Sequence, residues 1–504
     1  MHFYYASAEI FHLLLYLYGL PFVIIFTVLI FPKTSRVKDV SFPLILSIQS
    51  YLFYFVWVIR IKTKYDWQPS FLYKFIKTKD YRYYLKEMRE YDYLYIILDS
   101  INIPLLFLNI IITSLAIYYV AASSTSYGYL RNATVSLIFS MVLMNILFTT
   151  ANLAVFYVLF ELLIIPLFFL IGLGTRARRL RAVTLFFMYT VIFSYVMLFG
   201  LLYAWVWFGT LHYPALLVIF STMVEPGFPL YLFWITLLIA FLAKIPLVPF
   251  HIWLPEAHVE ATAVGSVMLA GLVLKIGAYA IIRFLVPLAS FFNSEVLFVS
   301  LAGISLFSAV YATIMTFFQV DFKKIIAYSS IAHLSFAIAG VFTLSKYGLA
   351  GGYFLNIGHG FVSAALFFLA GMLYRRYGTR LIKYYSGLGS LPYLSSFLLF
   401  FSFSNIAFPG TATFVAEFLI LLDIIHTCNI YLIILIFIIF VGSLFFSIWM
   451  YLRLTGGPIS HHVFPVHYDL EPYERNILYI LGVFVLITGL LPSIFFFDIF
   501  RITY

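Results

Sequence analysis

One stretch decides how this chain folds: FLAKIPLVPFHIWLPEAHVEATAVGSVMLAGLVLKIGAYAIIRF, from Phe241 to Phe284. Within it, Lys244 and Lys275 lie in otherwise apolar segments that are long enough to cross a membrane. A charged side chain at the centre of a bilayer costs about 2.5–3.5 kcal/mol on insertion scales. Each lysine therefore needs water, a partner of opposite charge or a functional role.

Two prolines, Pro246 and Pro249, follow Lys244 directly. Proline removes a backbone donor and clashes with the preceding helical turn, so the helix that carries Lys244 must kink or break there. Membrane proteins tolerate broken helices where the freed backbone is buried in protein or lines a wet cavity. The stretch thus predicts a buried lysine at a helix break near the middle of the chain.

The composition places the chain in a membrane. Of its 504 residues, 64% are hydrophobic and only 10% are charged, whereas soluble domains have about 25% charged residues. The one cysteine, Cys428, excludes a disulfide framework. It also excludes an iron–sulfur cluster held by this chain alone, which needs about four ligands. His251 and His258, with Glu256 between them, do not have the spacing of a zinc site, so we predict neither a metal nor a cofactor in this chain.

Apolar runs of membrane-spanning length predict an all-α polytopic protein with about fourteen transmembrane helices. The runs occupy residues 10–31, 43–59, 95–121, 133–151, 153–173, 182–208, 230–252, 263–287, 295–319, 325–344, 348–374, 391–424, 430–452 and 476–497. The twelfth contains Pro409-Gly410, so helices seven and twelve are both predicted to be broken.

Spans four to eight and nine to thirteen form two groups of five. Because five is odd, a second copy would insert upside down, which is the inverted-repeat plan of many transporters. The predicted division is 1–132 for helices one to three, 133–287 for the first repeat, 295–452 for the second, inverted repeat, and 453–504 for a loop and helix fourteen. Residues 60–92 form a long polar loop, either a solvated surface or a docking surface for a neighbouring subunit.

Basic residues gather in the loops that follow odd-numbered spans, for example in 176–181 and 375–383. Positively charged loops stay on one side of a membrane. With an even number of spans, both chain ends are then predicted to lie on the opposite side.

Six ionisable residues inside the predicted spans are candidates for a proton relay. They are Glu161, Lys244, Lys275, His333, His359 and Glu417. Burial disfavours the charged form of carboxylates and ammonium groups, so such groups exchange protons more readily near neutral pH. Buried ion pairs that only lock helices together are the alternative, but one or two would suffice for that. A series of this length is more typical of a proton relay.

Local sequence suggests partners for some of these residues. Ser329 and Ser330, one turn before His333, predict hydroxyl partners for it, and Gly358 and Gly360 predict room for water beside His359. Both histidines lie between Lys275 and Glu417 in chain order. Glu161 and Lys244, at similar depth in spans five and seven, are predicted to form an ion pair.

These segments resemble the chain 4 family of respiratory NADH:ubiquinone oxidoreductase, complex I. The similarity runs through KIPLVPFHIWLPEAHVEATAVGSVMLAGLVLKIGAYAIIR, DFKKIIAYSSIAHLSF, GHGFVSAALFFLAGMLYRRYGTR, FYVLFELLIIP and PGTATFVAEFLIL. It implies an antiporter-like fold with two inverted five-helix repeats. It also implies that the six ionisable residues form a hydrated proton-carrying axis, driven by redox energy from other subunits.

The resemblance further implies partners and a location. Flavin, iron–sulfur clusters and quinone would belong to partner subunits, and neighbouring antiporter-like chains would flank this one. The Phe- and Tyr-rich composition favours an organelle-encoded protein of the mitochondrial inner membrane over a bacterial plasma-membrane protein. Thr262 stands where the family usually has proline, which predicts a softer turn into span eight. A subunit of a multisubunit sodium/proton antiporter is the alternative function, because it shares the fold and the lysine–glutamate pair.

Overall fold

The computed structural model describes residues 99, 101–124, 126–173, 178–222, 227–292, 295–426, 430–458 and 468–492. Within these ranges all regular structure is helical, and the two β contacts are isolated bridges, Asn152 with His212 and Asp321 with Leu381. The all-α prediction is confirmed. The predicted spans at 10–31 and 43–59 and the polar loop at 60–92 lie outside the described residues.

From the third predicted span onward, each span corresponds to one helix or to a group of helical segments. The continuous ones are α6 (Asn102–Ser123), α7 (Tyr127–Thr149), α10 (Arg179–Phe208), α17 (Glu295–Phe317), α18 (Phe322–Phe342), α19 (Lys346–Tyr377), α22 (Ile430–Thr455) and α23 (Pro472–Leu490). A short helix that the sequence did not predict, α11 (Tyr213–Thr222), follows α10. Ten helical stretches of the described part are long and apolar enough to cross a membrane.

The two predicted helix breaks are present. The seventh span is α12 (Phe228–Lys244) followed by α13 (Trp253–Glu260), and both prolines lie in the turn between them. The twelfth is α20 (Pro392–Asn405) followed by α21 (Ala412–His426). Gly410 in that gap has a φ of +94°, a conformation that glycine adopts without the strain of a side chain. The helix α12 thus ends just before two prolines, and a Pro-Gly turn separates α20 from α21.

Two other spans are interrupted in ways that hydropathy did not reveal. The fifth is α8 (Leu153–Leu162) and α9 (Ile164–Gly172), which meet at Leu163 three residues before Pro166. The eighth contains two π-helical turns between its α-helical segments. Its parts are α14 (Ala263–Met268), η2 (Leu269–Val273), α15 (Leu274–Ala280), η3 (Ile281–Leu285) and α16 (Val286–Ala289). Such π turns concentrate at functional sites, and η2 ends two residues before Lys275.

The chain divides into two compact units. One comprises Met1–Leu173 with Ser194–Leu237, and in its described part α7 packs against α6, α8 and α9. The other comprises Gly174–Phe193 with Leu238–Tyr504. The two units are defined by which residues are in contact. The predicted repeats are defined by an inverted symmetry, which a list of contacts does not test. The repeat boundaries therefore stay a prediction.

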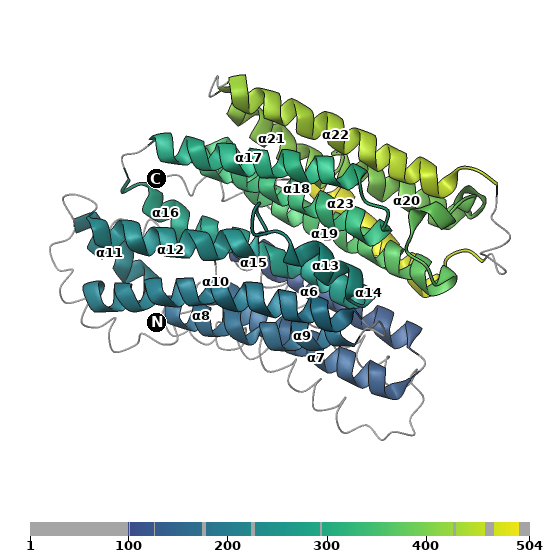
Figure 1. Cartoon of the computed structure of the whole chain (residues 1–504), viewed down its shortest axis with the longest axis horizontal. Coiled ribbons are helices and arrows are strands. Elements are labelled where there is room, and N and C mark those ends of the chain that lie inside the picture. The colour runs from purple at the N-terminus through teal and green to yellow at the C-terminus, as the bar shows by residue number, and fades with distance from the viewer. Residues whose placement is uncertain are drawn as a thin grey trace, which may run out of the picture. The chain divides into compact units, whose positions relative to one another are not determined.

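In the second unit α19 is the central helix. It packs against α14, α15, α18, α20, α21 and α23, and α17 packs on the other side of α18 (Figure 1). In both α18 and α19, 94% of the apolar window is buried, against 33% in α22. In a membrane protein the buried helices are shielded from lipid, so polar side chains on α18 and α19 face protein rather than hydrocarbon.

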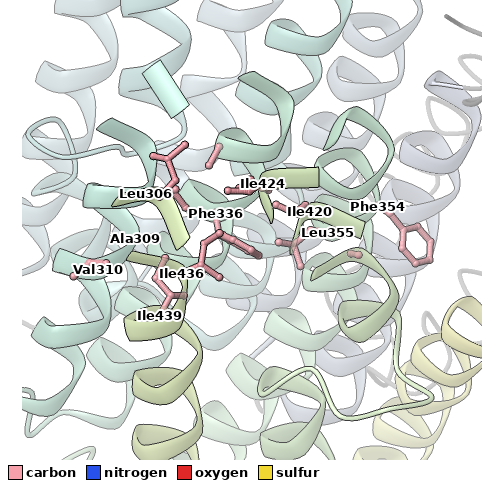
Figure 2. Close-up of a cluster of buried hydrophobic side chains, with 14 of the residues drawn as sticks. Leu306, Ala309, Val310, Phe336, Phe354, Leu355, Ile420, Ile424, Ile436 and Ile439 are labelled. Atoms are coloured by element: carbon pink, nitrogen blue, oxygen red, sulfur yellow. The ribbon is translucent and has the colours of Figure 1, made fainter. Parts of the chain in front are cut away.

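An apolar cluster holds α17, α18, α19, α21 and α22 together. Figure 2 shows Phe336 of α18, Leu355 of α19 and Ile420 of α21 in this cluster. Glycines let the helices approach closely here: a Cβ on Gly340 or on Gly351 would lie 2.8 Å from Cγ1 of Ile420. Small residues at helix contacts are the usual means of tight packing in membranes. This packing fixes α21 against α18 and α19, which carry the histidines.

Candidate functional site

Lys275 lies in the eighth span, one residue into α15 and with only 1% of its surface exposed. Its Nζ donates to the carbonyl of Ala270, five residues earlier and inside the π turn η2. The same Nζ lies 3.1 Å from Nδ1 of His359 on α19. The π turn thus supplies a backbone acceptor that holds the buried amine next to the histidine.

A row of three further side chains continues from this lysine. The ring centroids of His359 and His333 are 5.6 Å apart, and Nδ1 of His333 lies 3.0 Å from Oε1 of Glu417. These side chains come from α19, α18 and α21, and each of the three residues is at most 5% exposed. The structure therefore brings Lys275, His359, His333 and Glu417 together as one buried row.

The structure does not bear out the hydroxyl partners predicted for His333. The hydroxyls of Ser329 and Ser330 both donate to the carbonyl of Ile326 at 2.9 Å, because that acceptor lies within their own helix. Nε2 of His333 has no hydrogen-bond partner among the described residues. At Gly358, one of the two glycines beside His359, an added Cβ would lie 2.8 Å from that of Ala412. The role of Gly358 is to let the start of α21 approach α19.

Lys244 is the last residue of α12 and is 2% exposed, with its Nζ 5.8 Å from the ring centroid of Phe186. The elements that carry the two lysines meet at Gly277 of α15. A Cβ on Gly277 would lie 2.6 Å from Cγ1 of Ile245 and 3.1 Å from the carbonyl oxygen of Phe241. The missing side chain at this position brings the end of α12 against the helix of Lys275.

Glu161 lies in α8 of the first unit and is half-buried, and its Oε1 has no hydrogen-bond partner among the described residues. Lys244 belongs to the second unit. The predicted pair between them joins the two units, so it stays a prediction.

The sequence did not reveal a polar network at one end of the second unit. Arg380, predicted only as a loop residue, donates to Oε1 of Glu260 at 3.1 Å and to the carbonyl of Val259 at 2.8 Å, and its Nε lies 3.3 Å from Oδ2 of Asp321. Backbone pairing of the segments around Asp321 and Leu381 brings these groups together. The network ties the end of α13 to the start of α18.

Lys323, also predicted as a loop residue, is 6% exposed and donates to the carbonyl of Ala261 at 2.8 Å. Its place at the start of an apolar run gave no sign of burial.

The residues weighed for a metal do not converge. Glu256 pairs with Lys324 at 2.9 Å, His258 stacks on Phe367 at 4.5 Å between ring centroids, and His251 lies against Tyr311. No group of three potential ligands occurs among the described residues.

Thr262 also acts differently from the prediction of a softer turn. Its hydroxyl accepts a hydrogen bond of 3.2 Å from the backbone N–H of Gly265 and caps α14. A cap of this kind defines the start of a helix.

Chemically, the buried row suits proton transfer. Each member holds a proton on nitrogen or oxygen, and the bond between His333 and Glu417 persists with the proton on either partner. A charged group in so apolar a surrounding is disfavoured unless a neighbour compensates it. A change of charge at one member therefore alters proton affinity at the next.

The comparisons with known proteins agree with this picture. The family described as "NADH:quinone oxidoreductase/Mrp antiporter, TM" matches residues 150–446. The NADH-ubiquinone oxidoreductase chain 4 of Acanthamoeba castellanii is 37% identical over 421 residues, covering 82% of each chain. This chain belongs to the chain 4 family.

Solved structures place the fold in the same group. A chain of "Respiratory complex I from Thermus thermophilus with bound NADH" matches with a TM-score of 0.70 and 27% identity, over 80% of this chain and 84% of that one. A chain of the Mrp complex from Dietzia sp. DQ12-45-1b matches with a TM-score of 0.69 at 18% identity, over 78% and 81%. The second match reports only the fold. The predicted chain 4 family and its antiporter-like fold are thus confirmed for this multi-pass membrane protein.

Proposed function

We propose that this chain is a proton-translocating membrane subunit of an NADH:ubiquinone oxidoreductase in the mitochondrial inner membrane. Membership of the chain 4 family supports the assembly and the activity of the whole complex. The location is inferred from the relatives, whose names are those of a respiratory enzyme.

The observation that carries the proposal is the buried row from Lys275 through His359 and His333 to Glu417. From one end of the row to the other there are three steps: two contacts of about hydrogen-bond length and one ring-to-ring contact between the histidines. Four titratable groups in contact inside an apolar bundle have no structural need of one another, because apolar side chains would pack there at lower cost. Their retention is better explained by proton transfer.

In this proposal, Lys275, His359 and His333 pass the proton stepwise and Glu417 holds it at the break of the twelfth span. Glu161 and Lys244 are the two further members of the proposed proton relay. A movement of Glu161 toward or away from Lys244 changes how well the two charges compensate each other. The redox energy that moves these charges comes from other subunits.

We also propose that the chain holds no redox cofactor of its own, since its sequence has one cysteine and lacks a nucleotide-binding loop. The isolated, washed chain should show neither flavin absorbance nor iron. A chromophore bound at one per chain would overturn this part of the proposal.

A subunit of a sodium/proton antiporter remains the second candidate, because the same family includes Mrp antiporters. Purification in mild detergent separates the two. A complex I subunit should travel with flavin and iron–sulfur proteins that reduce quinone with NADH. Purification with only antiporter-like chains, and sodium-dependent proton movement without NADH, would favour the antiporter.

A further inference from the structure

Asp423 is a buried carboxylate that the predicted relay misses. It lies in α21, six residues beyond Glu417, and is 7% exposed. Its position inside the predicted span 391–424 was the available signal. Six helical residues advance about 9 Å along the axis, so the two carboxylates stand at successive depths on the same helix.

Only one of the two carboxylate oxygens of Asp423 has a hydrogen-bond partner among the described residues. Its Oδ1 accepts from the hydroxyl of Ser345, which in turn accepts from the backbone N–H of Gly348 and caps α19. Its Oδ2 is buried and has no hydrogen-bond partner among the described residues. A Cβ added to Gly348 would meet both this oxygen and the hydroxyl of Thr343, so glycine leaves open the space beside the two oxygens.

The direction of α21 places Asp423 on the outer side of Glu417. The helix begins against Gly358, near the middle of α19, and reaches Gly348, close to the start of α19, at Asp423. The start of α19 is the end opposite its basic terminus at Arg375.

Asp423 lies close to the protein surface at that end. Ser345, its hydroxyl donor, is half-buried, and the next residue, Lys346, is exposed. One hydroxyl thus separates the buried carboxylate from the surface.

An apolar turn of α21 separates Asp423 from Glu417. Ile420 is fully buried between them along the helix and fits against Gly340 and Gly351. Residues 418–422 of α21 carry no polar side chain, so we infer that water carries the proton through this turn. Apolar constrictions that wet and dry in this way act as gates.

From this arrangement we propose that Asp423 is a second proton-carrying carboxylate of the chain, placed between Glu417 and the surface where α19 begins. A water in the turn at Ile420 takes the proton from the Glu417 carboxyl and gives it to Oδ2 of Asp423, which leaves Glu417 ionised. Asp423 then releases the proton past Ser345 to the aqueous side. The inference rests on the proposed function, since it extends the same relay.

The test is Asp423→Asn in the whole complex, reconstituted in vesicles. Asparagine keeps the size and the acceptor oxygen for Ser345 but does not titrate. Protons moved per NADH oxidised, per assembled complex, should fall several-fold, and Asp423→Glu should recover part of the loss. Glu256→Gln is the matched control: it makes the same carboxylate-to-amide change in a partly exposed pair with Lys324, so it should leave this ratio near that of the unmodified complex.

Each outcome is decisive. An unchanged ratio in Asp423→Asn overturns the inference, and so does an equal fall in Glu256→Gln, which would mean that the loss of any carboxylate of this unit lowers the ratio. Asp423→Ser is the second non-titrating variant if the asparagine variant does not assemble, with the same expectation. Glu417→Gln, measured in parallel, separates the two levels: normal pumping there refutes the proposed function, whereas loss there with normal pumping in Asp423→Asn refutes only this inference.

Discussion

Glu417 illustrates how a carboxylate is accommodated inside an apolar bundle. The break before α21 places its helix start deep in the structure, and the glycines of α18 and α19 bring His333 within 3.0 Å. The pair is nearly inaccessible, with side-chain exposures of 5% and 6%. Removing one member of such a pair leaves a buried group without compensation, which makes conservative substitutions the informative ones.

We expect Glu417→Gln to lower proton pumping and coupled electron transfer while the complex still assembles, because the amide keeps a hydrogen bond to His333 but cannot carry the proton. Glu417→Asp should retain part of the activity, since it keeps a titratable group within one methylene. Pumping and NADH oxidation in vesicles check both. Full pumping by the glutamine variant is the result that contradicts the relay.

At the scale of elements, glycines and π turns decide which side chains meet. Gly277 lets α15 touch the end of α12, and the π turn η2 turns a backbone carbonyl toward Lys275. Neither feature changes the apolar character of the segment. Both features change where the backbone lies at a helix contact, by a few ångströms, and so decide which side chains meet.

Gly277→Ala tests this close approach. The new methyl would lie 2.6 Å from Ile245 and 3.1 Å from the backbone oxygen of Phe241, which cannot move aside freely. Overpacking of this kind costs about 1–3 kcal/mol, so the assembled complex should melt earlier and pump more slowly. Gly303→Ala on α17 is the control, because its methyl meets only Leu432 at 3.8 Å. Equal melting temperatures for the two variants would show that the contact does not matter.

At the scale of the whole molecule, the residues of the proposed relay come from both compact units. Glu161 belongs to one unit, and the row from Lys275 to Glu417 belongs to the other. Lys244, at the end of α12, has Ile245 as its neighbour against α15, so a change at this lysine acts next to the row. Whether Glu161 and Lys244 act together is therefore a question for mutagenesis.

Glu161→Gln and Lys244→Ala should each cripple pumping, and the double variant should be no worse than the worse single one, because members of a pair act as one unit. Breaking a buried pair costs about 3–5 kcal/mol, so rates are taken per assembled complex. Glu256→Gln is the control, since its pair with Lys324 is partly exposed and such pairs are worth about 0–1 kcal/mol. If the pair only locks helices, the single variants lose complex while the remainder pumps normally.

The orientation of the chain is a second prediction at this scale. Cysteines at Tyr347 and at Lys383, both exposed and at opposite ends of α19, should react with a membrane-impermeant reagent from opposite faces. Cys428→Ser provides the background without the natural thiol. Lys383 should be labelled from the side that receives the basic loops. Labelling of both positions from one face would contradict the fourteen-span topology.

The sequence by itself determined the membrane class, the helical fold and the two breaks. Apolar runs, prolines and a Pro-Gly pair act locally, through the cost of exposing backbone or charge to lipid. It also named four residues that the fold unites in one row. Only the tertiary structure decided their order and partners, because hydrogen bonds depend on which helix faces lie together. Ser329 illustrates this: its own helix supplies an acceptor before any neighbour does. Asp423 shows the converse, since its burial depends on Ser345 and Gly348 of a separate helix, which hydropathy does not place beside it.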